Sequence, residues 1–291
     1  MSTLDWSDFD LVLFDCDGVV YQGDEVLPGA IACIENLHEQ GKKFRFITNT
    51  STRSFEEMHK KFVRLGFGDW VKMSDCFHSG MAVAAYLTQY HCEVRRVFVV
   101  GGVGLVTELE RAGIECLCAP GETMDESEFL KLANDETFLV DAVVVGYDLD
   151  FSFYKLAASC LCFQKNLNCL FIAANDDTVD RIGSRWLIPG NGPALAAIAC
   201  ATSALPNIAH PRPTIVGKPN KFFGDFVAPN VDPNRVLVVG DRLDTDIALA
   251  TNCGFKSCLV LSGVSTLANV HASKFKPDFV ASGLNELLSK S

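Results

Sequence analysis

Short apolar runs that end at a polar residue alternate along this chain with stretches of helical periodicity. The run at 9–14 is largely apolar and stops at Asp15. Such a run is typical of a strand whose two faces are both covered, as in a parallel sheet. Helical periodicity follows at 29–40 and again at 55–65, and a second strand-like run lies between them at 43–47. Strands that alternate with helices predict an α/β chain with a mostly parallel sheet.

Further apolar runs continue this alternation. They lie at 96–100, 142–145, 169–173, 213–216 and 236–239. Four of the predicted strands are followed closely by a polar residue that can carry chemistry, namely Asp15, Thr48, Lys218 and Asp241. Because ligands bind outside the carboxyl ends of the strands in an open parallel sheet, we expect these four side chains to converge on one crevice.

The middle of the chain differs from the two ends. The stretch at 93–208 has its own predicted strands and helices but none of the acidic strand ends. We interpret it as a second domain that is inserted into a first domain, which comprises 1–92 and 209–291. A length of 291 residues is ordinary for two domains.

Composition narrows the classes of function. The net charge of −11 comes without any cluster of basic residues, which argues against nucleic acid as a partner. No apolar run approaches the ~20 residues that cross a bilayer, and the N-terminus is too acidic and polar for a signal peptide. We therefore expect no membrane partner and a cytoplasmic location. The 12 cysteines include no C-x-x-C pair, so we interpret them as reduced core residues rather than a zinc site.

The sequence Asp-Cys-Asp-Gly at 15–18 allows three interpretations. A calcium loop is excluded, because Gly18 stands at its fourth position rather than the sixth and Val26 occupies the twelfth, which needs a glutamate. An ordinary turn after a strand is the second interpretation. The third is a nucleophile, Asp15, with a proton-transfer group, Asp17, two residues later. The polar ends of the other strands favour the third.

The chemistry that fits these residues is phosphoryl transfer, which needs neutralised charge and in-line positioning. A carboxylate can attack phosphorus if a divalent cation screens its repulsion with the phosphate. Asp15 and Asp241 can supply the carboxylates that a hard cation such as Mg²⁺ prefers.

The remaining candidates have complementary roles. The hydroxyl of Thr48, the ammonium of Lys218 and backbone N–H groups from Gly18 onward can hold the phosphoryl oxygens. Asp17 can protonate the leaving oxygen and then activate the water that hydrolyses the intermediate.

Four ordered motifs resemble those of the haloacid dehalogenase superfamily. They lie at 14–20, 47–49, 216–219 and 240–246. The similarity is greatest to the group that contains the eukaryotic 4-nitrophenyl, phosphoglycolate and pyridoxal phosphatases, and it extends to 145–153, 171–177 and 189–192. The resemblance implies a Rossmann-like parallel-sheet core with a large α/β cap domain inserted between the second and third motifs. A phosphatase needs a leaving-group acid at the position of Asp17, whereas a dehalogenase does not.

The resemblance also implies a ligand set. Mg²⁺ would be bound by the carboxylates of Asp15 and Asp241 and by the backbone carbonyl of Asp17, while Asp246 would orient these ligands or Lys218. Relatives of this group pair through their caps, so the resemblance implies a homodimer.

Two further positions leave alternatives open. Asn49 follows Thr48 and either positions Asp17 or the bound phosphate, or caps the following turn. The run Gly-Gly-Val-Gly at 101–104 suggests a dinucleotide site, but Thr107 stands where the third glycine of that motif belongs, which favours a tight strand-to-helix turn.

Residues of the predicted cap indicate which substrate the crevice accepts. Tyr147 resembles an aromatic residue of the pyridoxal phosphatase branch. Asp180 and Arg181 depart from the pattern, because the family tends to have proline at the position of Arg181 and the pyridoxal branch has histidine before it. An exposed Arg181 or Arg185 can instead pair with a substrate carboxylate, which suits phosphoglycolate.

We therefore predict a Mg²⁺-dependent phosphomonoesterase that hydrolyses small phosphorylated metabolites, such as 2-phosphoglycolate, and 4-nitrophenyl phosphate in vitro. The reaction would pass through an aspartyl-phosphate intermediate on Asp15. Three alternatives stay open: a pyridoxal phosphate phosphatase, a phosphotransferase or mutase on the same core, and a scaffold protein that keeps the fold without the activity.

Overall fold

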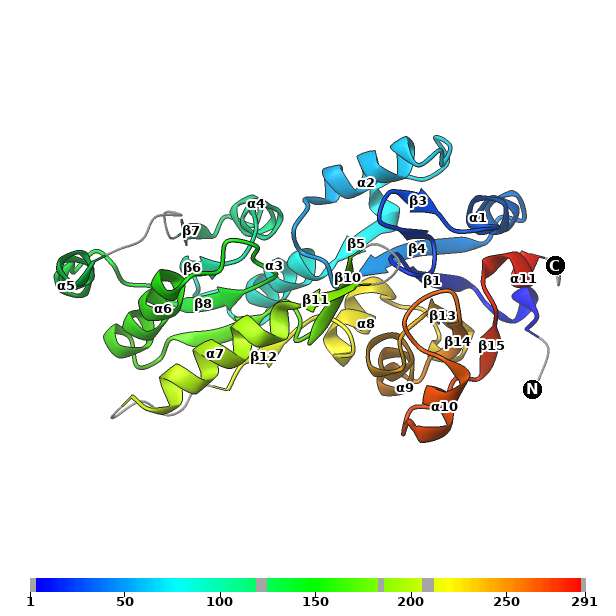
Figure 1. The fold of residues 1–291 in the computed structure, drawn as a ribbon. Helices are drawn as coiled ribbons and strands as arrows, with labels where there is room; N and C mark the ends of the chain where they lie inside the picture. The colour runs from blue at the N-terminus through cyan, green and yellow to red at the C-terminus, as the bar shows by residue number, and fades with distance from the viewer. Residues whose placement is uncertain (1–3, 119–124, 183–185, 206–211, 289–291) are drawn as a thin grey trace.

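The structure is a computed structural model that describes residues 4–118, 125–182, 186–205 and 212–288. It confirms the predicted α/β fold. The described residues form two parallel sheets that lie end to end in an elongated molecule, with both termini beside the first sheet (Figure 1). Every strand and helix predicted above is present, and its ends differ from the prediction by at most two residues.

The first sheet has six strands in the order β15-β14-β13-β1-β4-β5, and each neighbouring pair is parallel. Their bounds are β1 Leu11–Asp15, β4 Lys43–Thr48, β5 Cys76–His78, β13 Val236–Gly240, β14 Lys256–Val260 and β15 Phe279–Ala281. Strand β1 lies between β13 and β4, and Phe14 is in register with Val239 on one side and Phe46 on the other. The carboxyl ends of the three central strands therefore meet at one place.

Strand β1 is apolar throughout because both of its faces are covered. Val12 and Phe14 pack with helices α1, α2 and α11 on one face, while Leu11 and Leu13 pack with α3, α8 and α9 on the other. The helices of this part are α1 Ala30–Glu39, α2 Phe55–Arg64, α3 Ser79–Tyr90, α8 Lys221–Val227, α9 Ala248–Cys253, α10 Leu267–Ala272 and α11 Leu284–Leu288. Helix α9 follows a one-turn π-helix, η4 Leu243–Ile247.

The second sheet has five parallel strands in the order β12-β9-β8-β6-β7. Their bounds are β6 Arg96–Val100, β7 Glu115–Cys118, β8 Ala142–Val145, β9 Leu170–Ala173 and β12 Thr214–Ile215. Helices α3 and α4 cover one face and α5, α6 and α7 the other. These last four are α4 Val103–Arg111, α5 Glu126–Asn134, α6 Phe153–Lys165 and α7 Asn191–Ser203.

Two small antiparallel ribbons complete the fold. The pair β2 Tyr21–Gln22 and β3 Glu25–Val26 follows β1. The pair β10 Val179–Ile182 and β11 Trp186–Pro189 belongs to the middle of the chain but lies between the two sheets (Figure 1). It therefore brings residues of the middle stretch to the edge where the central strands of the first sheet end.

One strand does not lie where the sequence predicts. Lys218 reaches the common crevice as expected, but its strand, β12, pairs with β9 of the second sheet. Asp15, Thr48 and Asp241 follow strands of the first sheet, and the loop after β12 carries Lys218 across to them. The predicted boundary after residue 208 falls within 206–211, outside the described residues, so the division into 1–92, 93–208 and 209–291 stays a prediction.

The glycine run at 101–104 marks a close contact between the two parts. Gly102 precedes α4 and its N–H donates to the carbonyl of Tyr147 over 3.1 Å. A Cβ on Gly104 would lie 2.4 Å from the carbonyl carbon of Arg53, so only glycine lets α4 approach the loop after β4. This close packing explains the glycines without a dinucleotide.

Two predictions about composition can be compared with the structure. All the cysteines are free, as expected, but Cys92, Cys118 and Cys200 are exposed rather than core residues. In the described part of the chain, no helix is long and apolar enough to cross a membrane.

Candidate active site

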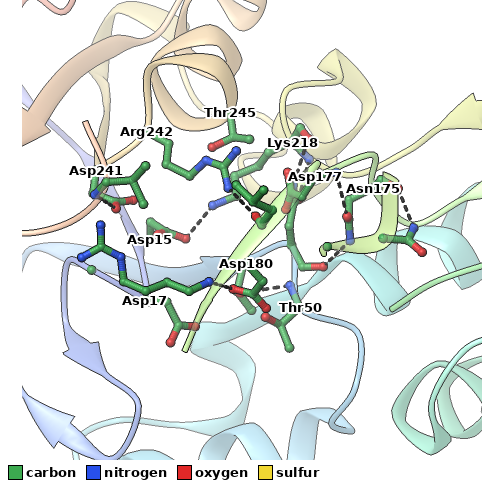
Figure 2. A pocket seen from close by; sticks show the side chains of 18 of the residues that line it. Asp15, Asp17, Thr50, Asn175, Asp177, Asp180, Lys218, Asp241, Arg242 and Thr245 are labelled. Atoms are coloured by element: carbon green, nitrogen blue, oxygen red, sulfur yellow. Dashed lines mark hydrogen bonds and ion pairs between the residues drawn. The ribbon is translucent and has the colours of Figure 1, made fainter. Parts of the chain in front are cut away.

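The carboxyl ends of the three central strands place Asp15, Thr48 and Asp241 side by side in a crevice between the first sheet and the β10–β11 ribbon (Figure 2). The three side chains are at least nine-tenths buried. The crevice also holds most of the other residues predicted from the sequence, which are Asp17, Gly18, Asn49, Tyr147, Asp180, Arg181 and Lys218. Asp246 lies directly behind them, in contact with Lys218.

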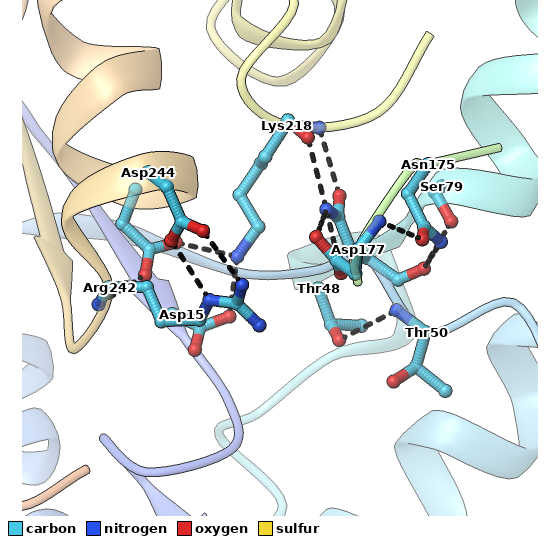
Figure 3. A network of polar contacts seen from close by, with 11 residues as sticks. Asp15, Thr48, Thr50, Ser79, Asn175, Asp177, Lys218, Arg242 and Asp244 are labelled. Carbon is cyan, nitrogen blue, oxygen red and sulfur yellow. Dashed lines mark hydrogen bonds and ion pairs between the residues drawn. The ribbon is translucent and has the colours of Figure 1, made fainter. Parts of the chain in front are cut away.

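Lys218 is the central cation of the site (Figure 3). Its ammonium lies 2.6 Å from Oδ1 of Asp15 and 2.7 Å from Oδ1 of Asp246, and it is almost completely buried. Burial disfavours the charged form, but the charges of Asp15 and Asp246 outweigh burial and raise the pKa of Lys218 above its ordinary value. Lys218 is therefore a fixed positive charge beside the nucleophile candidate.

Three carboxylates, those of Asp15, Asp241 and Asp246, surround the single ammonium of Lys218. Burial, together with the charges of Asp246 and Asp241, raises the pKa of Asp15 well above its usual range, although Lys218 opposes the shift. Burial and the charge of Asp246 likewise raise the pKa of Asp241 to about 7. These groups tend to hold protons until a second cation compensates their charge.

The acidic cluster fits a divalent cation. Carboxylate oxygens of Asp15, Asp241 and Asp246 lie within 4.8 Å of one another. Oδ2 of Asp241 accepts the N–H of Val264 over 2.7 Å, whereas its Oδ1 is buried and has no hydrogen-bond partner among the described residues. Buried carboxylate oxygens are the ligands that hard cations prefer.

Glycine packing shapes this cradle. Gly18 has a φ of 82°, and a Cβ there would lie 2.5 Å from Oδ2 of Asp241. A Cβ on Gly263 would come still closer to the same oxygen. Asp246 contributes to the cluster differently from Asp241, because its oxygens accept from Lys218 and from the N–H of Arg242. It therefore contacts Lys218, one of the groups that the resemblance implies it would orient.

Asp17 differs from the other acids. Its side chain is exposed to the crevice, and none of the described residues donates a hydrogen bond to its carboxylate. The surrounding protein desolvates it and raises its pKa, while Lys61 is the main charge that opposes this shift. A carboxyl group that borders the crevice and has a raised pKa suits proton transfer.

Asn49 joins three parts of the site. Its side-chain oxygen accepts the N–H of Lys218 over 2.9 Å, and its amide nitrogen donates to the carbonyl of Lys218 and to the carboxylate of Asp177. The carbonyl of Asn49 accepts from the side chains of Asn175 and Ser79. No hydrogen bond to Asp17 is present among the described residues. Asn49 therefore fixes the Lys218 loop and the β9–β10 loop, a role that neither alternative drawn from the sequence includes.

The sequence reasoning missed Asp177 and Asn175. Asn175 and Asp177 lie two and four residues after the end of β9, so their position near a strand end was a signal that could have identified them. The cap motif at 171–177 includes them, but their partner Asn49 is more than a hundred residues away in sequence. Only the folded chain brings the two segments together.

Two arginines form hydrogen bonds across the crevice, one from each side. Arg242 pairs with Asp244 and also donates to the carbonyl of Val179 over 3.3 Å. Arg181 reaches back to the carbonyl of Gly263 over 3.4 Å, and its buried Nε has no partner among the described residues. Arg185 lies outside the described residues.

Comparison with known sequences assigns the family. A model of haloacid dehalogenase-like hydrolases matches residues 12–115, and a HAD-hydrolase-like model matches residues 215–287. Phosphoglycolate phosphatase 1A of Arabidopsis thaliana is 36% identical over 95% of this chain and 76% of its own. Chronophin of Bos taurus is 34% identical over a match that covers 95% of this chain and 87% of chronophin. Human glycerol-3-phosphate phosphatase is 33% identical over a match that covers 97% of this chain and 91% of that enzyme.

Solved structures agree with this assignment. A 4-nitrophenylphosphatase of Thermotoga maritima superimposes with a TM-score of 0.79 at 28% identity, over 98% of both chains. A glycerol phosphate phosphatase of Mycobacterium tuberculosis, solved with magnesium, gives the same TM-score and identity over 97% of this chain and 77% of its own. The chain belongs to the haloacid dehalogenase superfamily, within the group of phosphatases predicted from its motifs. It is a phosphoric monoester hydrolase.

We predict that Asn49→Ala destabilises the protein by about 1–3 kcal/mol, because it leaves the buried N–H of Lys218 and the Asp177 carboxylate without their partner. Chemical denaturation measures the free energy of unfolding. Asn134→Ala is the matched control, because Asn134 is exposed and its side chain donates to the carbonyl of Leu130 in its own helix. Equal stability of the two variants would contradict the role assigned to Asn49.

Proposed function

We propose that the chain is a Mg²⁺-dependent phosphomonoesterase of small phosphorylated metabolites, with Asp15 as nucleophile. The observation that carries this proposal is the position of Asp15 at the end of the central strand. One of its oxygens is bound to Lys218, and the carboxylates of Asp241 and Asp246 are close by. Its second oxygen can therefore attack phosphorus while Lys218 fixes the first.

The chain's own residues can carry out the first step. Asp15 attacks the phosphorus in line, the bond from phosphorus to the ester oxygen breaks, and Asp17 gives a proton to the leaving alcohol. Lys218 and the hydroxyl of Thr48 hold phosphoryl oxygens. The oxygen of Thr48 already accepts the N–H of Thr50 over 3.1 Å, so its proton is free to donate.

The second step reverses the role of Asp17. As a carboxylate, it takes a proton from water while the water oxygen attacks the phosphorus of the aspartyl phosphate. The bond from phosphorus to Asp15 then breaks and phosphate is released. When bound at the acidic cluster, Mg²⁺ would neutralise charge on the phosphoryl group and the carboxylates. Asp15 and Asp241 would hold it with their carboxylates, and Asp17 with its backbone carbonyl.

Arg181 supports a substrate with a carboxylate near its phosphate. Lys218 and Arg242 already have carboxylate partners, whereas the buried Nε of Arg181 has none among the described residues. Arg181 can therefore form charge-assisted hydrogen bonds to a carboxylate in the crevice. This favours a 2-phosphoglycolate-like ester over pyridoxal phosphate, although Tyr147 also lines the crevice and keeps an aromatic substrate as the alternative.

Hydrolysis of 4-nitrophenyl phosphate tests the proposed reaction. We expect turnover by the wild type that requires Mg²⁺, and a loss of kcat of at least about 1,000-fold in Asp15→Asn, because the amide is not a nucleophile. Asp10→Asn is the control, since Asp10 is an exposed acid paired with Arg235. A wild type without activity on this ester and on a panel of phosphorylated metabolites would favour the scaffold alternative.

A second comparison tests the substrate. Arg181→Ala is expected to raise KM for 2-phosphoglycolate about tenfold more than KM for 4-nitrophenyl phosphate, because a hydrogen bond to a charged group contributes about 1.5–3 kcal/mol. Arg95→Ala, at an exposed arginine that does not line the crevice, is the control. Equal effects of Arg181→Ala on both substrates would rule out carboxylate recognition by Arg181.

Three expectations stay predictions. Competition between water and an alcohol acceptor distinguishes hydrolysis from phosphotransfer. The mass in solution, compared with 31.7 kDa for one chain, tests the homodimer. The cytoplasmic location is a proposal that two relatives named as chloroplastic do not share.

A further inference from the structure

The acids of the crevice differ in how they are held. Asp15 accepts from Lys218, Asp241 from the N–H of Val264, and Asp246 from Lys218 and the N–H of Arg242. The carboxylate of Asp17 has no hydrogen-bond donor among the described residues. A group that must give a proton in one step and take one in the next needs a defined position, so another interaction has to hold it.

A small side pocket opens from the crevice at Asp17. Asp17, Thr48 and Thr50 line both the crevice and this pocket, and Lys61 of α2 lines the pocket only. The space inside is about 20 Å³, which is enough for one or two water molecules. Asp17 is the acidic residue of its lining.

Lys61 is an unusual residue for this place. Its side chain is 3% exposed, and its ammonium forms no hydrogen bond or ion pair with the described residues. The ammonium lies 3.4 Å from the centre of the Tyr21 ring, a cation–π contact. Burying an ammonium is costly unless an opposite charge compensates it. Asp17 supplies the carboxylate that lines this pocket with Lys61. The pocket's other titratable residues are Arg53 and His78, and His78 lies 3.5 Å from Glu108.

Tyr21 connects Lys61 to the turn that carries Asp17. The carbonyl of Tyr21 accepts the N–H of Gly18 over 2.8 Å, and its own N–H donates to the carbonyl of Cys16 over 3.1 Å. The ring on which Lys61 rests therefore belongs to the same closed turn as Asp17. This contact fixes the positive charge of α2 relative to the catalytic turn.

We infer that Lys61 is a positioning residue for Asp17, holding its carboxylate by charge at the junction of the side pocket and the crevice. This inference rests on the proposed function and adds a residue to it. At this junction, Asp17 can reach the leaving oxygen in the first step and the attacking water in the second. The apolar stem of Lys61 also packs in the core, so a test must separate charge from packing.

A change of leaving group distinguishes the effect of the Lys61 charge from the effect of its packing. When the bond from phosphorus to the ester oxygen breaks, phenolate needs a proton from Asp17 more than 4-nitrophenolate does, because the nitro group stabilises the anion. Phenyl phosphate and 4-nitrophenyl phosphate otherwise present similar rings. A misplaced Asp17 should therefore harm hydrolysis of the first ester more than the second.

The experiment compares kcat/KM for the two esters in wild type, Lys61→Met and Lys61→Arg. Lys61→Met keeps the length and the contact with Tyr21 but removes the charge. We expect it to lower kcat/KM for phenyl phosphate about tenfold more than for 4-nitrophenyl phosphate, and Lys61→Arg to restore most of the loss. Lys60→Met, at the exposed neighbouring position, should leave both values unchanged within about twofold.

A double-mutant cycle completes the test. In the Asp17→Asn background, Lys61→Met should cause no further loss with phenyl phosphate, because the group that it positions is gone. Equal losses with both esters, or the same loss in the Asp17→Asn background, would overturn the inference. If Lys61→Met does not fold, as judged by thermal unfolding, Lys61→Gln takes its place in the same comparisons. A wild type that hydrolyses neither ester refutes the proposed function, whereas an active wild type with uniform losses refutes only the role of Lys61.

Discussion

The buried ammonium of Lys218 between Asp15 and Asp246 is the interaction on which the rest of the site depends. A charge this deeply buried is tolerated only with partners at hydrogen-bond distance, and both partners are carboxylates within 2.7 Å. The same pairing leaves the cluster with more acids than bases, since Asp241 adds a further carboxylate. This excess of carboxylates suits a further cation, since hard cations prefer carboxylate oxygens.

The fold supplies this arrangement from two directions. The sheet order puts β1 between β4 and β13, so three polar strand ends meet without any long connection. Lys218 arrives from the second sheet, and Asn49 fastens its backbone on both sides. Because Asn49 also binds Asp177, one side chain links the loop after β4, the Lys218 loop and the loop after β9.

The sequence predicted what depends on local pattern and motif. Strands such as β1 and β13 are apolar because both faces are covered, and the residues that follow them were identified by position alone. Contacts between distant segments were beyond this reasoning. Neither the pairing of β12 with the second sheet nor the contact of Lys61 with Tyr21 has a periodic signature. Lys61 in particular reads as an ordinary charged residue in the last turn of an amphipathic helix.

Detection of the covalent intermediate tests the central claim most directly. The reaction of the protein with a ³²P-labelled phosphomonoester can be quenched in acid within milliseconds and the labelled peptide identified by mass spectrometry. The account predicts that the label is on Asp15, that it is acid-stable but released by hydroxylamine, as acyl phosphates are, and that Asp15→Asn carries none. Label on another residue, or turnover with no labelled protein at any quench time, would contradict it.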